Sequence, residues 1–342
     1  MRRTRNMAVV ALIIASVALV VVSLVGGTER VDLGQAWREW REGLPPAQSP
    51  MLGIILDQRL PRTLAALIVG CGLALAGAAF QAMLRNPLAE PYTLGVASFG
   101  ALGAWTATIL IGAYSFPAYL LGLPTIQLLA FVFAELDIII VYQLAAHRDR
   151  ISPSVLLLGG ITMGMLANGG ILFMRYLADP NRVVMMDRWL MGGVDVLGYR
   201  PVLTLLAGVA PCAVILLAQA PKYDQLGFGP ELAAGRGVNV RLLQATTFVV
   251  GSLMTAVAVS VVGTIAFVGL IVPHIVRSIT GSRHRLLMPL SAVVGGGFLC
   301  FCDIIARKIL PGETPIGIVT TLLGGPFFLY LLLRRRFTDW DA

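Results

Sequence analysis

The sequence predicts an all-α membrane protein with about ten transmembrane helices. Of its 342 residues, 57% are hydrophobic and only 13% are charged, whereas soluble proteins average roughly 45–50% and 25%. The mean hydropathy is +0.82. Apolar stretches of about 20 residues, the length that crosses a hydrocarbon core of roughly 30 Å, recur along the whole chain. Together these observations predict a polytopic bundle.

Ten stretches have the required length and composition. They are residues 8–25, 62–84, 94–113, 124–145, 153–176, 200–220, 241–262, 264–281, 286–305 and 314–333. The first follows a basic start, as in a signal peptide, but it has no clear A-x-A cleavage site. We therefore interpret it as a retained first span.

Two of the connections between the spans are informative. Residues 27–59 carry Trp37, Trp40 and a Pro45-Pro46 pair, which favours an interfacial helix followed by a turn. Residues 221–241 contain Gly229-Pro230-Glu231, a plausible helix start because proline suits the first helical position and an acid there complements the helix dipole. Because no linker or low-complexity segment interrupts the chain, residues 1–342 are predicted to form a single transmembrane domain.

The distribution of basic residues predicts the orientation of the chain. With ten spans both termini lie on one side, and that side holds 15 of the 26 Lys and Arg residues against 6 acids. Cytoplasmic loops are enriched in Lys and Arg. Both termini are therefore predicted to be cytoplasmic, and the net charge of +8 reflects topology rather than binding to nucleic acid.

Residues with catalytic or metal-binding chemistry are sparse. The four cysteines, Cys71, Cys212, Cys300 and Cys302, fall inside predicted spans, where packing is the favoured role. No metal site or bound cofactor is predicted. The sequence contains no G-x-x-x-x-G-K-[ST] phosphate loop, so ATP hydrolysis is not expected in this chain.

Four motifs occur in a fixed order between about Arg59 and Leu333. They are RNPLAEPYTLG at 85–95, GTIAFVGLIVPH at 263–274, RHRLLMP at 283–289, and PIGIVT at 315–320 followed by GGP at 324–326. Together they resemble permeases of the FecCD type, the membrane subunits of bacterial ABC importers for iron chelates, haem and vitamin B12. One such string would be weak evidence, but four in order are strong.

The resemblance implies a type II ABC importer permease in the bacterial inner membrane. Such a permease forms a homodimer around a central pathway, works with two copies of a cytoplasmic ATP-binding subunit that uses ATP and Mg, and receives substrate from a periplasmic binding protein. The chain itself would be a transport subunit and not an enzyme, with no catalytic residues. Family members carry chemically different cargo, so the substrate is not predicted.

The resemblance also implies two groups of site residues, and the distribution of glycines in the predicted spans suggests a third. The segment matching the family's ATPase-coupling region contains Leu226, Gly227, Gly229, Pro230, Glu231, Ala234, Arg236 and Gly237. Candidates for docking the binding protein are Arg59, Arg62 and Arg307; ordinary interfacial anchoring is the alternative, and Asp303 lies one turn from Arg307 as a possible internal partner. Candidates for the translocation pathway are Gly160, Met163, Gly164, Asn168, Pro315 and Gly317, with tight helix packing as the alternative for the glycines.

Two acids near the middle of the fourth predicted span raise a second functional hypothesis. A charge at the bilayer centre costs on the order of 2.5–3.5 kcal/mol on insertion scales, which makes Glu135 and Asp137 functional candidates. Spaced by two, they point to different helix faces and do not easily share a partner. They could serve a proton-coupled secondary transporter, but a structural role is favoured.

Overall fold

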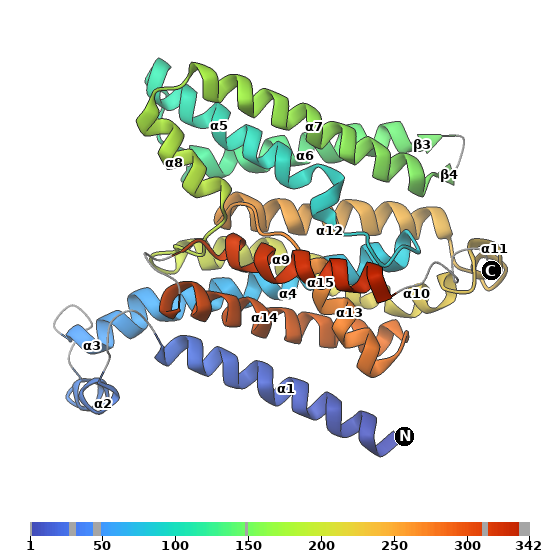
Figure 1. The fold of residues 1–342 in the computed structure, drawn as a ribbon, viewed down its shortest axis with the longest axis horizontal. Helices are drawn as coiled ribbons and strands as arrows, with labels where there is room; N and C mark the ends of the chain where they lie inside the picture. The colour runs from blue at the N-terminus through green and yellow to red at the C-terminus, as the bar shows by residue number, and fades with distance from the viewer. Residues whose placement is uncertain (1, 27–31, 44–48, 148–149, 310–313, 335–342) are drawn as a thin grey trace.

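The computed structural model describes residues 2–26, 32–43, 49–147, 150–309 and 314–334 (Figure 1). Its helices are α1 (Arg2–Val25), α2 (Leu33–Arg41), α3 (Pro50–Gly53), the π-helix η2 (Ile54–Arg59), α4 (Leu60–Met83), the 3-10 helix η3 (Pro91–Leu94), α5 (Val96–Tyr114), α6 (Thr125–Ala145), α7 (Pro153–Leu177), α8 (Pro180–Leu190), α9 (Arg200–Ala218), α10 (Ala220–Leu226), α11 (Pro230–Gly235), α12 (Val240–Val262), α13 (Val268–Thr280), α14 (His284–Lys308) and α15 (Ile316–Arg334). Two short antiparallel hairpins pair β1 (Tyr119–Leu120) with β2 (Leu123–Pro124) and β3 (Ala146–His147) with β4 (Arg150–Ile151).

Each of the ten predicted spans coincides with a helix in the described part of the chain. Eight are long and apolar enough to cross a membrane, and the second begins early, as one continuous helical stretch from Pro50 to Met83. The apolar helix Val268–Thr280 is shorter, whereas α15 has 19 residues, as many as α5 and α9. The predicted all-α polytopic fold is therefore confirmed, with one element, α13, that does not reach full spanning length.

The long helices run in roughly the same direction and divide the molecule into two ends (Figure 1). One end carries α10 and α11, and there α1 begins and α15 ends; we call it the α11 end. The opposite end carries α2, α3 and α8, and we call it the α3 end. The arrangement agrees with an even number of crossings. The assignment of the α11 end to the cytoplasm stays a prediction, and the terminal residues 1 and 335–342 lie outside the described residues.

Helix α4 lies at the core of the bundle, and its glycines let neighbouring backbones touch it. Its apolar window is 78% buried, whereas that of α1 is 11% buried, so α1 lies at the periphery. A Cβ atom on Gly77 would overlap the carbonyl oxygen of Gly269 in α13, and one on Gly70 would overlap the carbonyl oxygen of Gly295 in α14. Close approach of this kind is the usual basis of helix association in lipid.

The predicted eighth span, 264–281, begins four residues too early. Gly263 has φ +71° and Phe267 has φ +69°, and the residues between them are not helical. Helix α13 therefore begins only at Val268 and has 13 residues, a length of about 20 Å at 1.5 Å per residue. Hydropathy is continuous across this break, so an apolar window alone does not detect it.

Candidate functional site

The predicted coupling segment forms two short helices at the α11 end. Gly229, with φ +111°, precedes Pro230 at the first position of α11, and Glu231 lies in its first turn. The helix ends at Gly235, and Gly237 has φ +84°. Asn239 then caps α12 by accepting a hydrogen bond from the Leu242 amide at 2.9 Å. The expected short helix with its glycine stop is confirmed, while its role in coupling stays a prediction.

Most of this segment is exposed. Glu231, Ala234, Arg236 and Gly237 lie on the surface, as do the apolar side chains of Leu232 and Phe228, which are 59% and 64% exposed. By contrast, Leu226 is buried and anchors the end of α10. A folded loop that presents two large apolar side chains is typical of a surface that binds another protein.

Arg236 connects the two short helices across their shared turn. Its guanidinium donates a hydrogen bond to Gln225 Oε1 at 2.7 Å and lies 5.1 Å from the centre of the Phe228 ring. The contacts place an exposed positive charge beside the exposed aromatic ring. Phe228 was not among the predicted site residues, although an aromatic side chain within a polar loop was a signal that could have found it.

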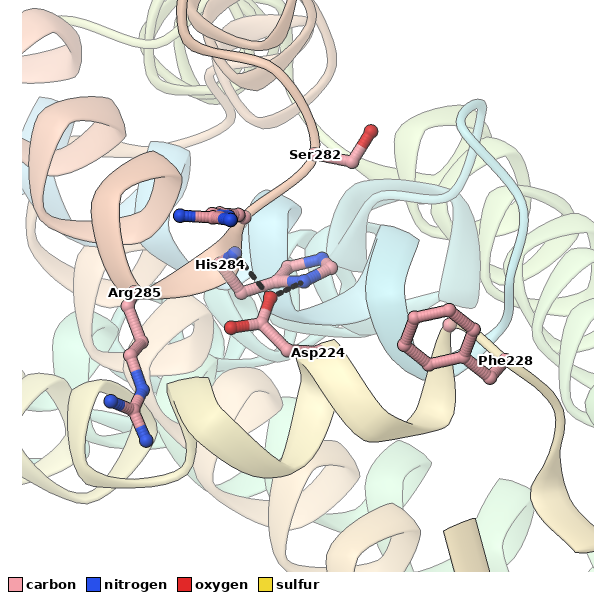
Figure 2. A pocket seen from close by; sticks show the side chains of 7 residues that line it. Asp224, Phe228, Ser282, His284 and Arg285 are labelled. Carbon is pink, nitrogen blue, oxygen red and sulfur yellow. Dashed lines mark hydrogen bonds and ion pairs between the residues drawn. The ribbon is translucent and has the colours of Figure 1, made fainter. Parts of the chain in front are cut away.

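A cavity lies between α10 and the start of α14 (Figure 2). It has a volume of about 560 Å³, and its lining includes Phe228, Ser282, Arg283 and Arg285. At its base the Asp224 carboxylate accepts a hydrogen bond from the backbone amide of His284 at 2.6 Å, and the same oxygen lies 3.0 Å from His284 Nδ1. Because His284 is the first residue of α14, these bonds connect α10 directly to a spanning helix.

Tyr223 connects α10 to a second spanning helix. Its buried hydroxyl donates to Gln219 Oε1 at 3.0 Å and lies 2.6 Å from Thr247 Oγ1 in α12. Burial raises the pKa of the Tyr223 hydroxyl, so the group stays protonated and able to donate. Side-chain hydrogen bonds therefore connect α10 to both α12 and α14.

The predicted pathway residues fall in two places. Gly160 and Gly164 in α7 face η3 and α5 of the same chain; a Cβ on Gly160 would lie 2.5 Å from the Leu94 Cα. Met163 packs in a buried cluster beside them, whereas Asn168 is exposed. The two glycines thus have a clear packing role, and the lining of a pathway by α7 stays a prediction.

Pro315 and Gly317 lie at a junction of three segments near the α3 end. The Gly317 amide donates to the Gly192 carbonyl at 3.1 Å, and the Gly193 amide donates to the Val262 carbonyl at 2.9 Å. The Thr264 hydroxyl donates to the Leu190 carbonyl. The start of α15 is therefore joined to the end of α8 and to the irregular segment after α12. The Gly192-Gly193 pair was a missed signal for this junction.

The three predicted docking arginines all have partners within the chain. Buried Arg59 donates to the Val25 carbonyl at 2.5 Å. Buried Arg307 lies 2.5 Å from an Asp303 carboxylate oxygen, which confirms the possible pairing inferred from their spacing. Arg62 bridges Asp303 at 3.0 Å and Asp195 at 3.1 Å. Docking by these arginines stays a prediction, and for Arg62 it requires exchange of an internal partner.

Asp195 is a site residue that the sequence did not reveal. It lies in the connection between α8 and α9, its side chain is half exposed, and its second oxygen lies 3.6 Å from Arg188. The separation of 133 residues between Arg62 and Asp195 explains why no local pattern connects them.

The two intramembrane acids of α6 point in different directions, as their spacing predicted. Asp137 is fully buried and lies beside Gly95 at the start of α5, whereas Glu135 is partly exposed. The two oxygens of Asp137 have no hydrogen-bond partner among the described residues. This carboxyl group therefore lies near the amino-terminal end of α5, where the helix dipole is positive.

Glu90, in the connection between α4 and α5, lies against the break after α12. Its carboxyl group accepts a hydrogen bond from the Phe267 amide, and burial raises the pKa of Glu90 from 4.5 to about 7. The neighbouring Tyr92 hydroxyl bonds to the Thr264 side chain. The RNPLAEPYTLG and GTIAFVGLIVPH motifs are thus in direct contact.

The raised pKa of Glu90 predicts a pH-dependent stability. In the folded protein Glu90 holds its proton up to about pH 7, whereas in the unfolded chain it loses the proton near pH 4.5. The stabilisation is therefore complete below pH 4.5 and falls by up to about 3 kcal/mol as the pH rises through 7. We expect the midpoint of thermal unfolding to decline over this window in the wild type and to decline less in Glu90→Gln. Parallel pH profiles of the two proteins would contradict this assignment.

The described residues contain no group of three or more His, Cys, Asp or Glu side chains that could hold a metal ion. Cys212, Cys300 and Cys302 are buried and unpaired, and Cys71 is partly buried. Within the described part of the chain, the cysteines occupy packing positions.

The fold and its surface features define a class: a polytopic membrane protein with a structured, exposed loop at one end. A family model described as the FecCD transport family matches residues 12–334, and the chain belongs to this family of ABC importer permeases. The hemin transport system permease protein of Yersinia pestis is 35% identical over 287 residues, 84% of this chain and 85% of that protein. The vitamin B12 import system permease protein of Vibrio cholerae serotype O1 is 36% identical over 285 residues, 83% of each.

A solved structure extends the likeness to the whole fold. An ABC transporter solved in an inward-facing conformation matches with a TM-score of 0.82 and 28% identity, covering 96% of this chain and 99% of that one. The family resemblance read from the four motifs is confirmed. The proton-coupled alternative built on Glu135 and Asp137 is not favoured by this membership.

Proposed function

We propose that this chain moves an iron complex, such as haem or a ferric siderophore, or a corrinoid such as vitamin B12, from the periplasm to the cytoplasm by alternating access. Family membership and the named cargo of two relatives support this class of substrate. The observation that carries the proposal is the folded, exposed α10–α11 loop bonded to α12 and α14. Such a loop suits a subunit that receives its energy from a partner.

The partner would be a cytoplasmic ATP-binding subunit, present in two copies, that binds ATP and Mg. No cofactor is assigned to the permease itself. A second copy of the chain would complete the pathway. One face of α7, which includes Leu158, Met165 and Phe173, is uncovered within the chain and supports such a contact. In this proposal both termini lie in the cytoplasm and the permease lies in the bacterial inner membrane.

At the α3 end, a periplasmic substrate-binding protein would dock near the arginine cluster. Arg62 is the best candidate, because its partner Asp195 is half exposed and can be displaced by a carboxylate of the docking protein. Arg59 and Arg307 are buried and would contribute by holding this surface in place. Specificity for the cargo would lie mainly in the binding protein.

The source of energy for uptake distinguishes this proposal from a proton-coupled transporter. In proteoliposomes containing the permease, its ATPase and the binding protein, we expect uptake of one of three labelled probes, haem, a ferric siderophore or cyanocobalamin. Uptake should require internal ATP and survive a protonophore. A matched variant, Glu135→Gln with Asp137→Asn, should keep this ATP dependence if it folds, as checked by gel filtration. Uptake that continues without ATP and stops with a protonophore would refute the proposal.

A further inference from the structure

A short helix at the α3 end has a surface that the transport function does not use. Helix α2 lies at the edge of the molecule beside the outer end of α1 and is seen nearly end-on, whereas the spans run across the view (Figure 1). Its axis is therefore roughly perpendicular to the spans, that is, parallel to the membrane plane. We propose that α2 is an amphipathic anchor that binds phospholipid headgroups of the bilayer surface at the α3 end.

The inner face of α2 is fixed to the protein. Ala36 and Glu39 are 5% and 7% exposed. Glu39 accepts hydrogen bonds from the Leu52 amide and from Gln35 Nε2, each at 3.0 Å. Asp32 caps the helix by accepting from the Gly34 amide at 2.8 Å. The orientation of α2 is therefore set by α3 and by its own cap, and the opposite face is held outward.

That outward face combines aromatic rings with positive charge. Trp37 and Trp40 are 55% and 58% exposed, and their rings lie 5.0 Å apart. The Arg41 guanidinium lies 5.8 Å from the centre of the Trp37 ring, and Arg38 is also exposed. Indole rings settle at the headgroup level of a bilayer, and arginine binds phosphate oxygens through its planar fork. A helix with both is typical of one that lies in the interface.

The position of α2 favours lipid, rather than another protein, as its binding partner. The neighbouring span α1 is the least buried of the eight candidate spans, so it faces lipid along most of its length. Helix α2 lies on this side of the bundle, with α7 at the opposite edge (Figure 1). The surface next to the outer end of α1 is therefore the bilayer surface itself.

Tryptophan fluorescence in vesicles tests the proposal. The parent protein carries Trp340→Phe. Its remaining tryptophans are Trp37 and Trp40 on α2, together with Trp105 and Trp189. The matched control adds Trp37→Phe and Trp40→Phe, changes that leave the buried contacts of α2 intact. The difference in emission between the two proteins reports on α2 alone. Vesicles are made from phosphatidylcholine with bromine atoms placed either near the headgroup or near the chain ends.

We expect bromine near the headgroup to quench most of the emission that comes from the α2 tryptophans. Bromine near the chain ends should quench little of it. Adding Arg38→Gln and Arg41→Gln to the parent should reduce the quenching by headgroup-proximal bromine. Equal quenching by the two lipids, or full access of aqueous iodide to the α2 indoles, would overturn the proposal. It would also fail if iodide were blocked only after a periplasmic binding protein was added, because α2 would then be a protein contact.

Discussion

Leu232→Asp is expected to separate the permease from its ATPase without unfolding it. Leu232 is 59% exposed on α11, so the folded protein loses almost no packing. If Leu232 is a hot spot of the interface, its loss costs about 2 kcal/mol or more, which corresponds to roughly a 30-fold loss of affinity. We expect a comparable loss when binding of the purified ATPase to the detergent-solubilised permease is titrated. Charge reversal at Glu231 or Arg236 should weaken binding in the same direction but less.

The control is Leu121→Asp. Leu121 is 86% exposed in the turn between β1 and β2. This turn follows α5, which ends at the α3 end. The two variants make the same chemical change on opposite sides of the bundle. Equal ATPase affinity in wild type, Leu232→Asp and Leu121→Asp would remove α11 from the coupling surface. Equal loss in both variants would point to general destabilisation.

Gly77→Leu is expected to prevent stable folding. A side chain at this position meets the backbone of Gly269, and backbone does not move aside as a flexible side chain does. Overpacking typically costs 1–3 kcal/mol and sometimes more, and we expect at least about 3 kcal/mol here because α4 and α13 must separate. The free energy of unfolding in detergent, or the yield of monodisperse protein, measures the effect.

Gly169→Leu serves as the comparison in α7. No atom lies within 4 Å of the place where a Cβ on Gly169 would be, and the substitution replaces glycine by a better helix former. Because Gly169 lies on the α7 face proposed to contact a second copy, stability is compared in the monomeric protein, where it should match or slightly exceed that of the wild type. If both leucine variants were equally stable, the close crossing of α4 and α13 would not exist.

The sequence predicts the parts of this fold that depend on local pattern. Apolar length located the ten helical segments, and the Gly229-Pro230-Glu231 start located α11. Both follow from rules that act within a few residues. The break before α13 escaped prediction because Gly263 and Thr264 stand inside continuous apolar sequence, where hydropathy does not report backbone conformation.

The candidate sites depend more on distant contacts. Asp195 meets Arg62 across 133 residues, and Asp303 meets it across 241. Similarly, Asp224 lies 60 residues from the helix that it caps. In each case the individual residue type gives no sign of its partner. The family resemblance indicated the coupling segment and the arginines, but the internal partners of those arginines required the fold.

Helix α14 connects the two ends of the molecule. One end is held by Asp224 of α10 and the other carries Asp303 and Arg307, which bind Arg62 and α1. Its 25 residues span about 37 Å at 1.5 Å per residue. The helix thus extends from α10 at the α11 end to Arg62 and α1 at the α3 end. In the proposed importer, a single helix therefore connects the surface for the ATPase with the surface for the binding protein.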